Sequence, residues 1–401
     1  MNGPPSSGSD REPSRLAARR NKQAQSENQS VPEPLRAGTA RGPVGTRLVS
    51  LDALRGFDMF WIMGGDYMVR SWPKIHDSPL TRGLAAQMEH CEWAGFHFYD
   101  LIFPLFIFIV GVSLAFSITR MVEYDGRAAA IKRIVFRSVV LFVLGILYMG
   151  GVANGFENVY LAGVLQRIAV AYFFAALIFC FFRAREMVLI CLALFLGYWA
   201  LMTFVPVPGI DAPSLAGPGR NLAHYLDELY LPGQKFEGTL LSTLPAVANC
   251  LLGVFAGLLL KNDAVPGQRK VYWLLGSGAA SLALGFAWAQ EFPVIKLLWT
   301  PTYVLVACGY SALLLGSFYQ IIELWQFRKW AQPFVWIGMN AITIYLVASI
   351  VNFRRLAARF VGGDIKLFLG DYSDLVTSLV ALALVFWLVN FLYRRRVFLR
   401  L

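Results

Sequence analysis

The chain has 401 residues, of which 57% are hydrophobic and 14% are aromatic, and its formal net charge is +11. Soluble domains are about 45–50% apolar, so this composition excludes a soluble globular protein and predicts a polytopic membrane protein. The five cysteines show no paired spacing, which argues against a disulfide framework and a zinc knuckle. No metal site and no nucleic-acid partner are predicted.

The first 46 residues differ from the rest of the chain. They are rich in Ser, Pro, Gly, Gln and Arg and contain almost no aliphatic run. This composition predicts a disordered basic tail on the cytoplasmic side. Because the tail has no apolar stretch of signal-peptide type, we expect no cleaved signal. The chain therefore divides into a tail at residues 1–46 and a membrane domain at residues 47–401.

Ten apolar stretches follow the tail, and about 20 apolar residues are enough to cross a bilayer. They predict an all-α fold, a polytopic membrane bundle of about ten helices. Residues 292–302 are ambiguous and are compatible with a re-entrant piece. The ten stretches are residues 51–69, 99–119, 134–152, 159–182, 187–205, 240–260, 271–289, 302–322, 333–352 and 374–393.

The placement of Lys and Arg sets the orientation of the bundle. With the N-terminus inside, the inner loops are basic, whereas the outer loops 153–158 and 206–219 contain no Lys or Arg. Two outer segments, 70–98 and 353–373, fit less well because each contains several basic residues. The pattern favours two cytoplasmic termini and places all four histidines on the outer side.

The first predicted span carries charged residues. Asp52 and Arg55 are three residues apart, so they share a helix face and can pair. A structural ion pair and a ligand contact are equally compatible with this spacing. Asp66 follows Asp52 by nearly four turns and returns to the same face near the outer end.

A histidine and a carboxylate stand at the entrance of the second span. His90 lies in a polar segment, and Asp100 precedes the apolar run from Leu101 to Val110. These side chains are expected where water meets the bilayer, which is a suitable place for proton transfer. Asp100 either orients the His90 ring or pairs with Arg167.

The fourth span contains Gln166 and Arg167 within an apolar helix. An intramembrane arginine faces the bundle interior, a water-filled cavity or an acid. Asp100 and Asp66 are the candidate acids for a buried pair with Arg167. We therefore treat Arg167 as a functional candidate, with the buried ion pair as the alternative.

The sixth span carries one amide and two closely spaced glycines. Asn249 lies in the middle of the span, where a hydrogen bond between helices and a ligand contact are equally compatible. Gly253 and Gly257 are four residues apart, which predicts close packing against another helix.

Seven sequence motifs follow one another along the chain: SLDALRGF, HCEWAGFHFYDLIFP, FIFIVGVSL, GVLQRIAVAY, EGTLLSTLPAVANCLLGVFAG, LLWTPTYVL and GMNAITIYL. The spacing H-x-x-W-x-G-x-x-x-x-D-L-x-F-P is the most specific of these patterns. In this order, the motifs resemble the heparan-alpha-glucosaminide N-acetyltransferase family and its bacterial relatives. The resemblance covers nearly the whole chain after residue 47.

The resemblance implies an acyl-CoA-dependent N-acetyltransferase in the bacterial inner membrane. Cytosolic acetyl-CoA would be the co-substrate, and an amino-sugar or glycan acceptor would bind on the outer, periplasmic side. The active histidine of the family maps onto His90. An important asparagine of the family maps onto Asp66, so an amide is replaced by a carboxylate here. The family also implies a possible homodimer.

Acetyl transfer to an amine requires a base, because the attacking amine must lose a proton. A neutral imidazole suits this task, so His90 is the candidate base or acetyl carrier. Direct transfer in a ternary complex and an acetyl-histidine intermediate are both compatible with the sequence. The predicted catalytic residues are His90, Asp66 and Asp100. The predicted acetyl-CoA-binding residues are Asp52, Arg55, Gln166, Arg167 and Asn249.

Two other functions fit the same pattern. Ten helices with buried charges also describe a transporter of a sugar or a lipid-linked intermediate. However, we find no convincing internal repeat, and the intramembrane charges gather in the first four spans, which favours a fixed site. A sensor or scaffold with a decayed transferase site is the third possibility, and Asp66 is the feature that supports it.

Overall fold

The structure is a computed structural model, and it describes residues 1, 3, 48–153, 155–210, 215–231 and 239–397. Nearly all of the predicted tail lies outside the described residues. Leu48–Leu401 form one compact unit. The described residues contain helices and turns, with one isolated β-bridge, between Ala94 and Ile295. The predicted all-α fold is confirmed.

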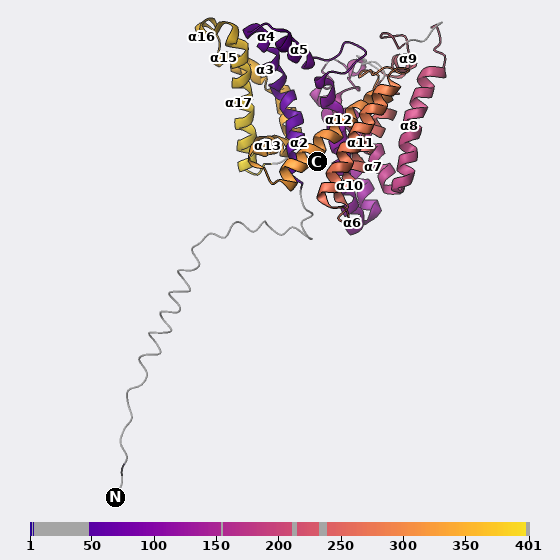
Figure 1. The fold of residues 1–401 in the computed structure, drawn as a ribbon, viewed down its shortest axis with the longest axis horizontal. Coiled ribbons are helices and arrows are strands. Elements are labelled where there is room, and N and C mark those ends of the chain that lie inside the picture. Colours follow the sequence, from indigo (N-terminus) through magenta and orange to yellow (C-terminus); the bar gives the residue numbers. More distant parts are fainter. Residues whose placement is uncertain (2, 4–47, 154, 211–214, 232–238, 398–401) are drawn as a thin grey trace. The chain divides into compact units, whose positions relative to one another are not determined.

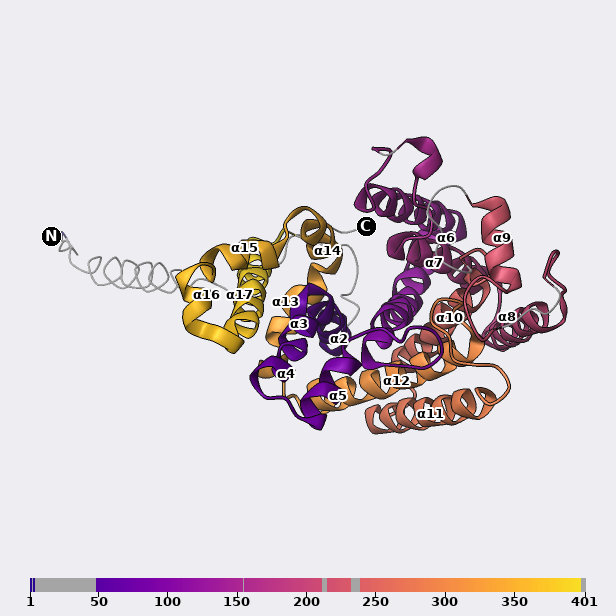
Figure 2. The ribbon, with the colours of Figure 1, turned by 90° about the horizontal axis from the view of Figure 1, so that it is seen from above.

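The two ends of this unit lie side by side. Figures 1 and 2 show α2–α5 beside α13–α17, whereas α6–α12 form a second group of helices. The first group comprises α2 (Val49–Phe60), α3 (Asp66–Arg70), α4 (Trp72–Ile75), α5 (Pro79–Gln87), α13 (Gln332–Met339), α14 (Ala341–Ile350), α15 (Phe353–Phe360), α16 (Asp364–Leu369) and α17 (Ser373–Arg394). The second comprises α6 (Ile102–Tyr148), α7 (Val164–Phe181), α8 (Ala184–Phe204), α9 (Leu222–Tyr230), α10 (Thr243–Lys261), α11 (Gly267–Trp288) and α12 (Pro301–Tyr319).

Seven helices in the described residues are long and apolar enough to cross a membrane, or up to eight if the bent pair α13–α14 is one span. The sequence predicted about ten. The difference arises partly because spans 99–119 and 134–152 are counted together: the run Phe98–Tyr148 consists of two helices that meet at Gly126, where the backbone is non-helical. In addition, the first predicted span consists of three short pieces.

The first predicted span is broken near its middle. Helix α2 ends at Phe60, a π-helical turn covers Trp61–Gly65, and α3 begins at Asp66. Gly64 has a φ of +121°, which a residue with a Cβ rarely adopts. The break changes the helical phase between Asp52 and Asp66, so their separation in sequence no longer fixes a common face.

Helices α6 and α10 cross at very close range. A Cβ added to Gly253 would overlap the carbonyl oxygen of Phe108, and a Cβ added to Gly111 would overlap that of Cys250. The third glycine of this contact, Gly257, faces Val112 in the same way. The close packing predicted from Gly253 and Gly257 is therefore confirmed, and it fixes the helix that begins beside Asp100.

We expect Gly253→Val to destabilise the protein by about 1–3 kcal/mol or more, because the added side chain forces α6 and α10 apart. The measurement is the thermal unfolding midpoint of the purified protein in detergent. Gly276→Val in α11 is the matched control, since a Cβ there meets nothing within 4 Å. Equal unfolding midpoints for the two variants would contradict this account of the helix crossing.

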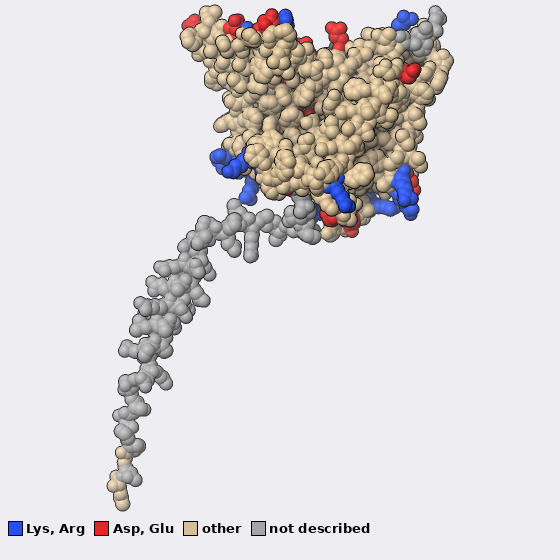
Figure 3. Space-filling view, viewed as in Figure 1, with Lys and Arg blue, Asp and Glu red and all other residues tan. Residues whose placement is uncertain are grey.

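Charged side chains gather at two ends of the unit. On the face shown in Figure 3, Lys and Arg gather mostly at one end and acidic side chains mostly at the other, with an uncharged band between them. Such a band fits the hydrocarbon core of a bilayer, where ionised side chains are costly. Helices α4, α5, α15 and α16 lie at the acidic end.

Candidate active site

The buried carboxylate of Asp100 organises the segment between α5 and α6. Its side chain is fully buried, and its Oδ2 atom accepts hydrogen bonds from the backbone N–H groups of Cys91, at 3.2 Å, and His97, at 3.0 Å. Two backbone donors from either side of the loop thus close it around one acid. This arrangement fixes His90, the residue directly before Cys91.

Asp100 also holds the ring of His90. The His90 Nδ1 atom lies 2.9 Å from Asp100 Oδ1, and the ring centroid lies 4.9 Å from that of Tyr99. The His90 side chain remains 52% exposed, so a substrate can reach it. Of the two interactions that the sequence allowed for Asp100, the structure has the one that orients His90.

Lys296 is the third member of this cluster, and the sequence analysis did not identify it. Its Nζ atom lies 2.7 Å from His90 Nδ1 and 3.2 Å from Asp100 Oδ1. It takes the place beside Asp100 that we considered for Arg167. A lysine between apolar residues in the ambiguous segment 292–302 was the available signal.

Backbone contacts between two loops explain how Lys296 reaches His90. The Gly95 N–H donates to the carbonyl of Val294 at 2.9 Å, next to the bridge between Ala94 and Ile295. Residues 292–300 therefore form a loop that contacts the His90 segment, and α12 begins directly after it. The two partners are 206 positions apart in the sequence, and spacing alone gives no sign of their contact.

Burial and charge act on the cluster in opposite directions. Burial lowers the pKa of Lys296, whereas the adjacent Asp100 carboxylate raises it, and burial is the larger effect. Burial raises the pKa of Cys91 to about 11, and the same carboxylate adds to this shift. The Cys91 thiol is therefore neutral near pH 7 and is poorly suited to act as a nucleophile.

Pro104 and Tyr303 fix the carbonyl end of Asp100. Pro104 has no N–H, so the carbonyl four residues earlier, that of Asp100, lacks its helical donor. The hydroxyl of Tyr303 replaces it and donates to this carbonyl at 2.7 Å. Asp100 and Tyr303 are both fully buried, so the hydrogen bond between them anchors the start of α6 against α12.

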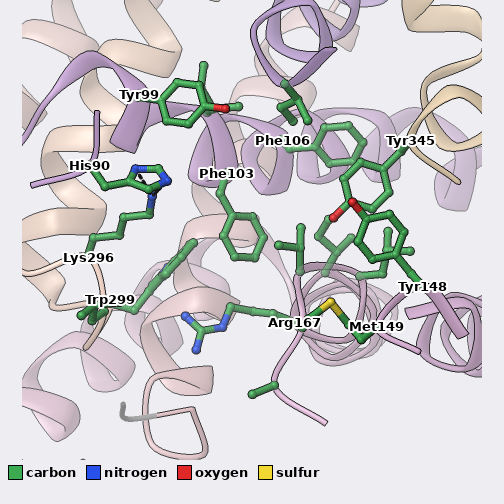
Figure 4. Close-up of a pocket in the computed structure, with 18 of the residues that line it drawn as sticks. His90, Tyr99, Phe103, Phe106, Tyr148, Met149, Arg167, Lys296, Trp299 and Tyr345 are labelled. Atoms are coloured by element: carbon green, nitrogen blue, oxygen red, sulfur yellow. Dashed lines mark hydrogen bonds between the residues drawn. The ribbon is translucent and has the colours of Figure 1, made fainter. Parts of the chain in front are cut away.

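Two members of the cluster, His90 and Lys296, line a cavity of about 600 Å³. Phe103, Phe106 and Trp299 form much of its apolar wall, and the stacked rings of Tyr148 and Tyr345 also border it (Figure 4). Residues of the wall come from α2, α6, α7, α14 and the 292–300 loop. Both groups of helices therefore contribute to the cavity.

Arg167 lines the same cavity. Its guanidinium carbon lies 4.8 Å from the ring centroid of Trp299, a cation–π contact (Figure 4). Arg167 belongs to none of the ion pairs among the described residues. The predicted alternative, a buried ion pair of Arg167 with Asp100 or Asp66, is therefore wrong. Its charge is available to a ligand in the cavity.

The other residues predicted to bind acetyl-CoA do not appear in the described lining of the cavity. Gln166 is buried and donates to the Tyr160 carbonyl at 2.9 Å. Asn249 is buried and donates to the Pro104 carbonyl at 3.2 Å, which links α10 to α6. The structure thus gives Asn249 a hydrogen bond between helices.

Asp52 and Arg55 form the predicted ion pair, at 3.4 Å, and Arg55 also donates to Ser113 on α6 at 2.8 Å. The pair joins the start of α2 to α6, and neither residue lines the described part of the cavity. The pairing predicted from their spacing is confirmed.

Asp66 is buried in α3 and is also absent from the described cavity lining. It lies 3.8 Å from Arg70, and Arg70 donates to Glu89 at 2.9 Å. Because Glu89 directly precedes His90, Asp66 is connected with the His90 segment through these two side chains.

Cys91, His97 and Asp100 have ligand-type atoms within 4.8 Å of one another, which is a possible metal-binding arrangement. However, Asp100 already accepts hydrogen bonds from two backbone N–H groups and contacts both His90 and the ammonium of Lys296. The lysine supplies the positive charge that a metal ion would bring. These donors therefore fit a hydrogen-bonded cluster better than a metal site.

A family profile and two mammalian proteins that match this chain all carry the same family name. Residues 47–287 match the profile of the family described as heparan-alpha-glucosaminide N-acetyltransferase, catalytic. Heparan-alpha-glucosaminide N-acetyltransferase from Mus musculus is 26% identical over 378 residues, which cover 77% of this chain and 56% of the mouse protein. The Homo sapiens protein of the same name is 26% identical over 425 residues, which cover 84% of this chain and 62% of the human protein.

The matched region includes His90, Asp100 and Arg167, and it ends before Lys296. The chain spans less than two thirds of the length of the two mammalian relatives. The profile nevertheless covers more than half of the chain, from the start of the compact unit through α10 and almost all of α11. The chain therefore belongs to the heparan-alpha-glucosaminide N-acetyltransferase family.

Proposed function

We propose that the protein transfers the acetyl group of cytosolic acetyl-CoA to the amino group of an amino-sugar-like acceptor on the outer side of the membrane. The observation that carries this proposal is the contact of the buried Asp100 with His90 and Lys296, which both line a 600 Å³ cavity. Family membership supports the same reaction, because both mammalian relatives are named as N-acetyltransferases.

His90 acts as the general base in this mechanism. The tautomer that we propose has the Nδ1–H of His90 donating to Asp100 and the lone pair on Nε2, where the Lys296 Nζ atom lies 3.2 Å away. The exposed side of the ring then faces the cavity, where an acceptor amine can approach it. Full burial of Asp100, with two backbone donors, keeps the ring orientation fixed.

The reaction needs no further reagent. The amine nitrogen attacks the thioester carbonyl carbon, a C–N bond forms, and the amine proton passes to His90 Nε2. The C–S bond then breaks, and the imidazolium returns the proton to the departing thiolate of CoA. The products are an amide and free CoA. We propose this direct transfer over an acetyl-histidine intermediate because the cavity is large enough for both reacting groups.

Lys296 stabilises the charge that develops on the thioester oxygen. Its ammonium is next to the base, is largely removed from water and is held by Asp100. A preorganised cation in such a place is worth much more than in water. Among the residues predicted to bind acetyl-CoA, Arg167 is the one that lines the cavity, where it contacts the ring of Trp299. Its guanidinium suits binding of a phosphate or carboxylate group there.

Several parts of the proposal rest on the sequence. Binding of the CoA phosphates near Asp52 and Arg55, contacts of Gln166 and Asn249 with acetyl-CoA, and a catalytic role for Asp66 stay predictions. The same holds for a bacterial inner-membrane location with two cytoplasmic termini, and for a homodimer.

A transfer assay across a membrane tests the proposal. Purified protein is reconstituted into liposomes that enclose glucosamine, and radiolabelled acetyl-CoA is added outside. We expect labelled N-acetylglucosamine to accumulate inside the liposomes. Protein-free liposomes and liposomes with heat-denatured protein give the background.

Two outcomes separate the parts of this proposal. Binding of acetyl-CoA without transfer to glucosamine would reject glucosamine as an acceptor. If folded protein binds no acetyl-CoA at all in equilibrium dialysis, the transferase function is wrong, and uptake of labelled sugar by the same liposomes would favour the transporter.

A further inference from the structure

A second cavity, of about 320 Å³, lies between α15 and the start of α17. Figure 1 shows α15 and α16 at the same end of the unit as α4 and α5, which lead into the His90 segment. Three basic residues line it, namely Arg354, Arg355 and Lys366. Nothing in the proposed acetyl transfer uses this cavity.

Its positive charges are only partly neutralised. Asp374 is the one acid in the described lining, and it is held by Lys74 at 2.5 Å and faces Arg354 at 3.9 Å. Arg354 also lies over the ring of Tyr67 at 4.2 Å. Arg354 therefore has its own partners on α3 and α17.

Lys366 attracts Asp374 from beyond ion-pair distance, and Arg355 is the lining cation with no such partner among the described residues. Neither takes part in an ion pair among the described residues, and both are exposed. Asp364 and Asp371 belong to the neighbouring α16 and the turn after it, but they do not belong to the described lining. The cavity thus offers a guanidinium and an ammonium to an anion.

The cavity adjoins the candidate membrane span Asp364–Arg394. Helix α17 begins at Ser373, and Thr377, one turn further in, lines the cavity. Large apolar side chains stand exposed beside it: Phe360 is 60% exposed, Leu367 81% and Phe368 91%. Such side chains next to basic residues are typical of segments that lie in the membrane interface.

The predicted topology does not account for these basic residues. Lys and Arg normally gather on the cytoplasmic side, yet the segment 353–373 carries several of them at the end of the unit predicted to lie outside. Basic residues on the outer side do not help to set the topology. A role in ligand binding would account for their presence.

We propose that this cavity binds the phosphate group of an anionic phospholipid. The fork of Arg355 pairs with two phosphate oxygens, and Lys366 contributes a second charge. The acyl chains then run beside Leu367 and Phe368 toward the uncharged band. Inorganic phosphate shares the anionic chemistry but has nothing to place on the exposed apolar side chains, so we favour the lipid.

Binding by the full-length protein in detergent tests this proposal without any use of acetyl transfer. The probes are phosphatidylglycerol, phosphatidylcholine and inorganic phosphate, and native mass spectrometry measures the bound fraction. We expect phosphatidylglycerol to bind more tightly than phosphatidylcholine, and Arg355→Gln to weaken its binding about tenfold or more. Arg359→Gln is the matched control, because Arg359 is on the same helix but outside the cavity lining. The affinity of this variant for phosphatidylglycerol should stay within about twofold of the wild-type value.

Four outcomes would overturn the proposal. Equal losses in the Arg355 and Arg359 variants would mean diffuse surface attraction, and equal binding of the two lipids would remove the role of the net negative charge. Inorganic phosphate binding as tightly as phosphatidylglycerol would mean that the ligand is a free phosphate. If Arg355→Gln fails to fold, Lys366→Gln replaces it, and unchanged lipid binding by that folded variant would also reject the site.

Discussion

Replacement of His90 by glutamine is expected to lower the rate constant of acetyl transfer by about 10²–10⁴-fold, the usual contribution of a positioned acid–base group. Glutamine keeps a polar side chain near Asp100 but cannot take a proton from the amine. Because His90 is half exposed at the mouth of the cavity, its loss should not affect folding. The measurements are kcat and the dissociation constant of acetyl-CoA. The kcat should fall, whereas the dissociation constant should change little.

His76→Gln is the control for this variant. His76 ends α4 and is absent from the described cavity lining, so its replacement should leave kcat unchanged. A folded His90→Gln protein with the kcat of the wild type would reject His90 as the base.

The same pair of proteins separates the two chemical routes. Wild-type protein is incubated with radiolabelled acetyl-CoA and no acceptor, and protein-bound label is counted. Direct transfer predicts none. Label on the wild type that is absent from His90→Gln would instead establish an acetyl-histidine intermediate.

Lys296→Met is expected to lower kcat by about 10²–10³-fold, the effect of removing one preorganised group that stabilises an oxyanion. Methionine keeps the length and the apolar stem of the side chain but removes the ammonium beside Asp100. Acetyl-CoA affinity should change less than kcat, because the charge on the thioester oxygen develops only in the transition state. A purely structural lysine would instead lower the unfolding midpoint and leave the kcat of folded protein intact.

Lys261→Met is the matched control. Lys261 ends α10, and its Nζ atom lies 3.7 Å from Glu123 in an exposed ion pair. Exposed ion pairs of this kind contribute little to stability. We expect wild-type kcat and an almost unchanged unfolding midpoint. Equal losses in the two lysine variants would show that the Lys296 effect is not specific.

The pH profile adds a readout that depends on the Lys296 charge. Burial lowers the pKa of Lys296, so the ammonium deprotonates at a lower pH than an ordinary lysine. Activity that needs the ammonium is present below this pKa and is lost as the pH rises through it. Lys296→Arg keeps the charge to higher pH, so its remaining activity should persist further into the alkaline range. An identical alkaline limb in both proteins would contradict the proposed role.

Local spacing accounts for the parts of the site that lie close together in the sequence. Asp52 and Arg55 are one turn apart, so a helix brings them together without help from the rest of the fold. His90 and Asp100 lie on the two sides of a short loop that one carboxylate closes through backbone hydrogen bonds. The apolar stretches likewise determined the all-α membrane fold, because each must satisfy its own backbone polar groups within the bilayer.

Only the tertiary structure decided which distant charges meet. Lys296, and not Arg167, contacts Asp100, because a backbone contact between Gly95 and Val294 joins two loops that are far apart in the chain. Arg167 instead lies over Trp299 and lines the cavity. Side-chain type gives the chemistry that each residue can perform, but helix packing and loop pairing select its partner. For that reason the sequence by itself determined the fold class and kept His90 within reach of Asp100, whereas the tertiary structure added Lys296 and the cavity.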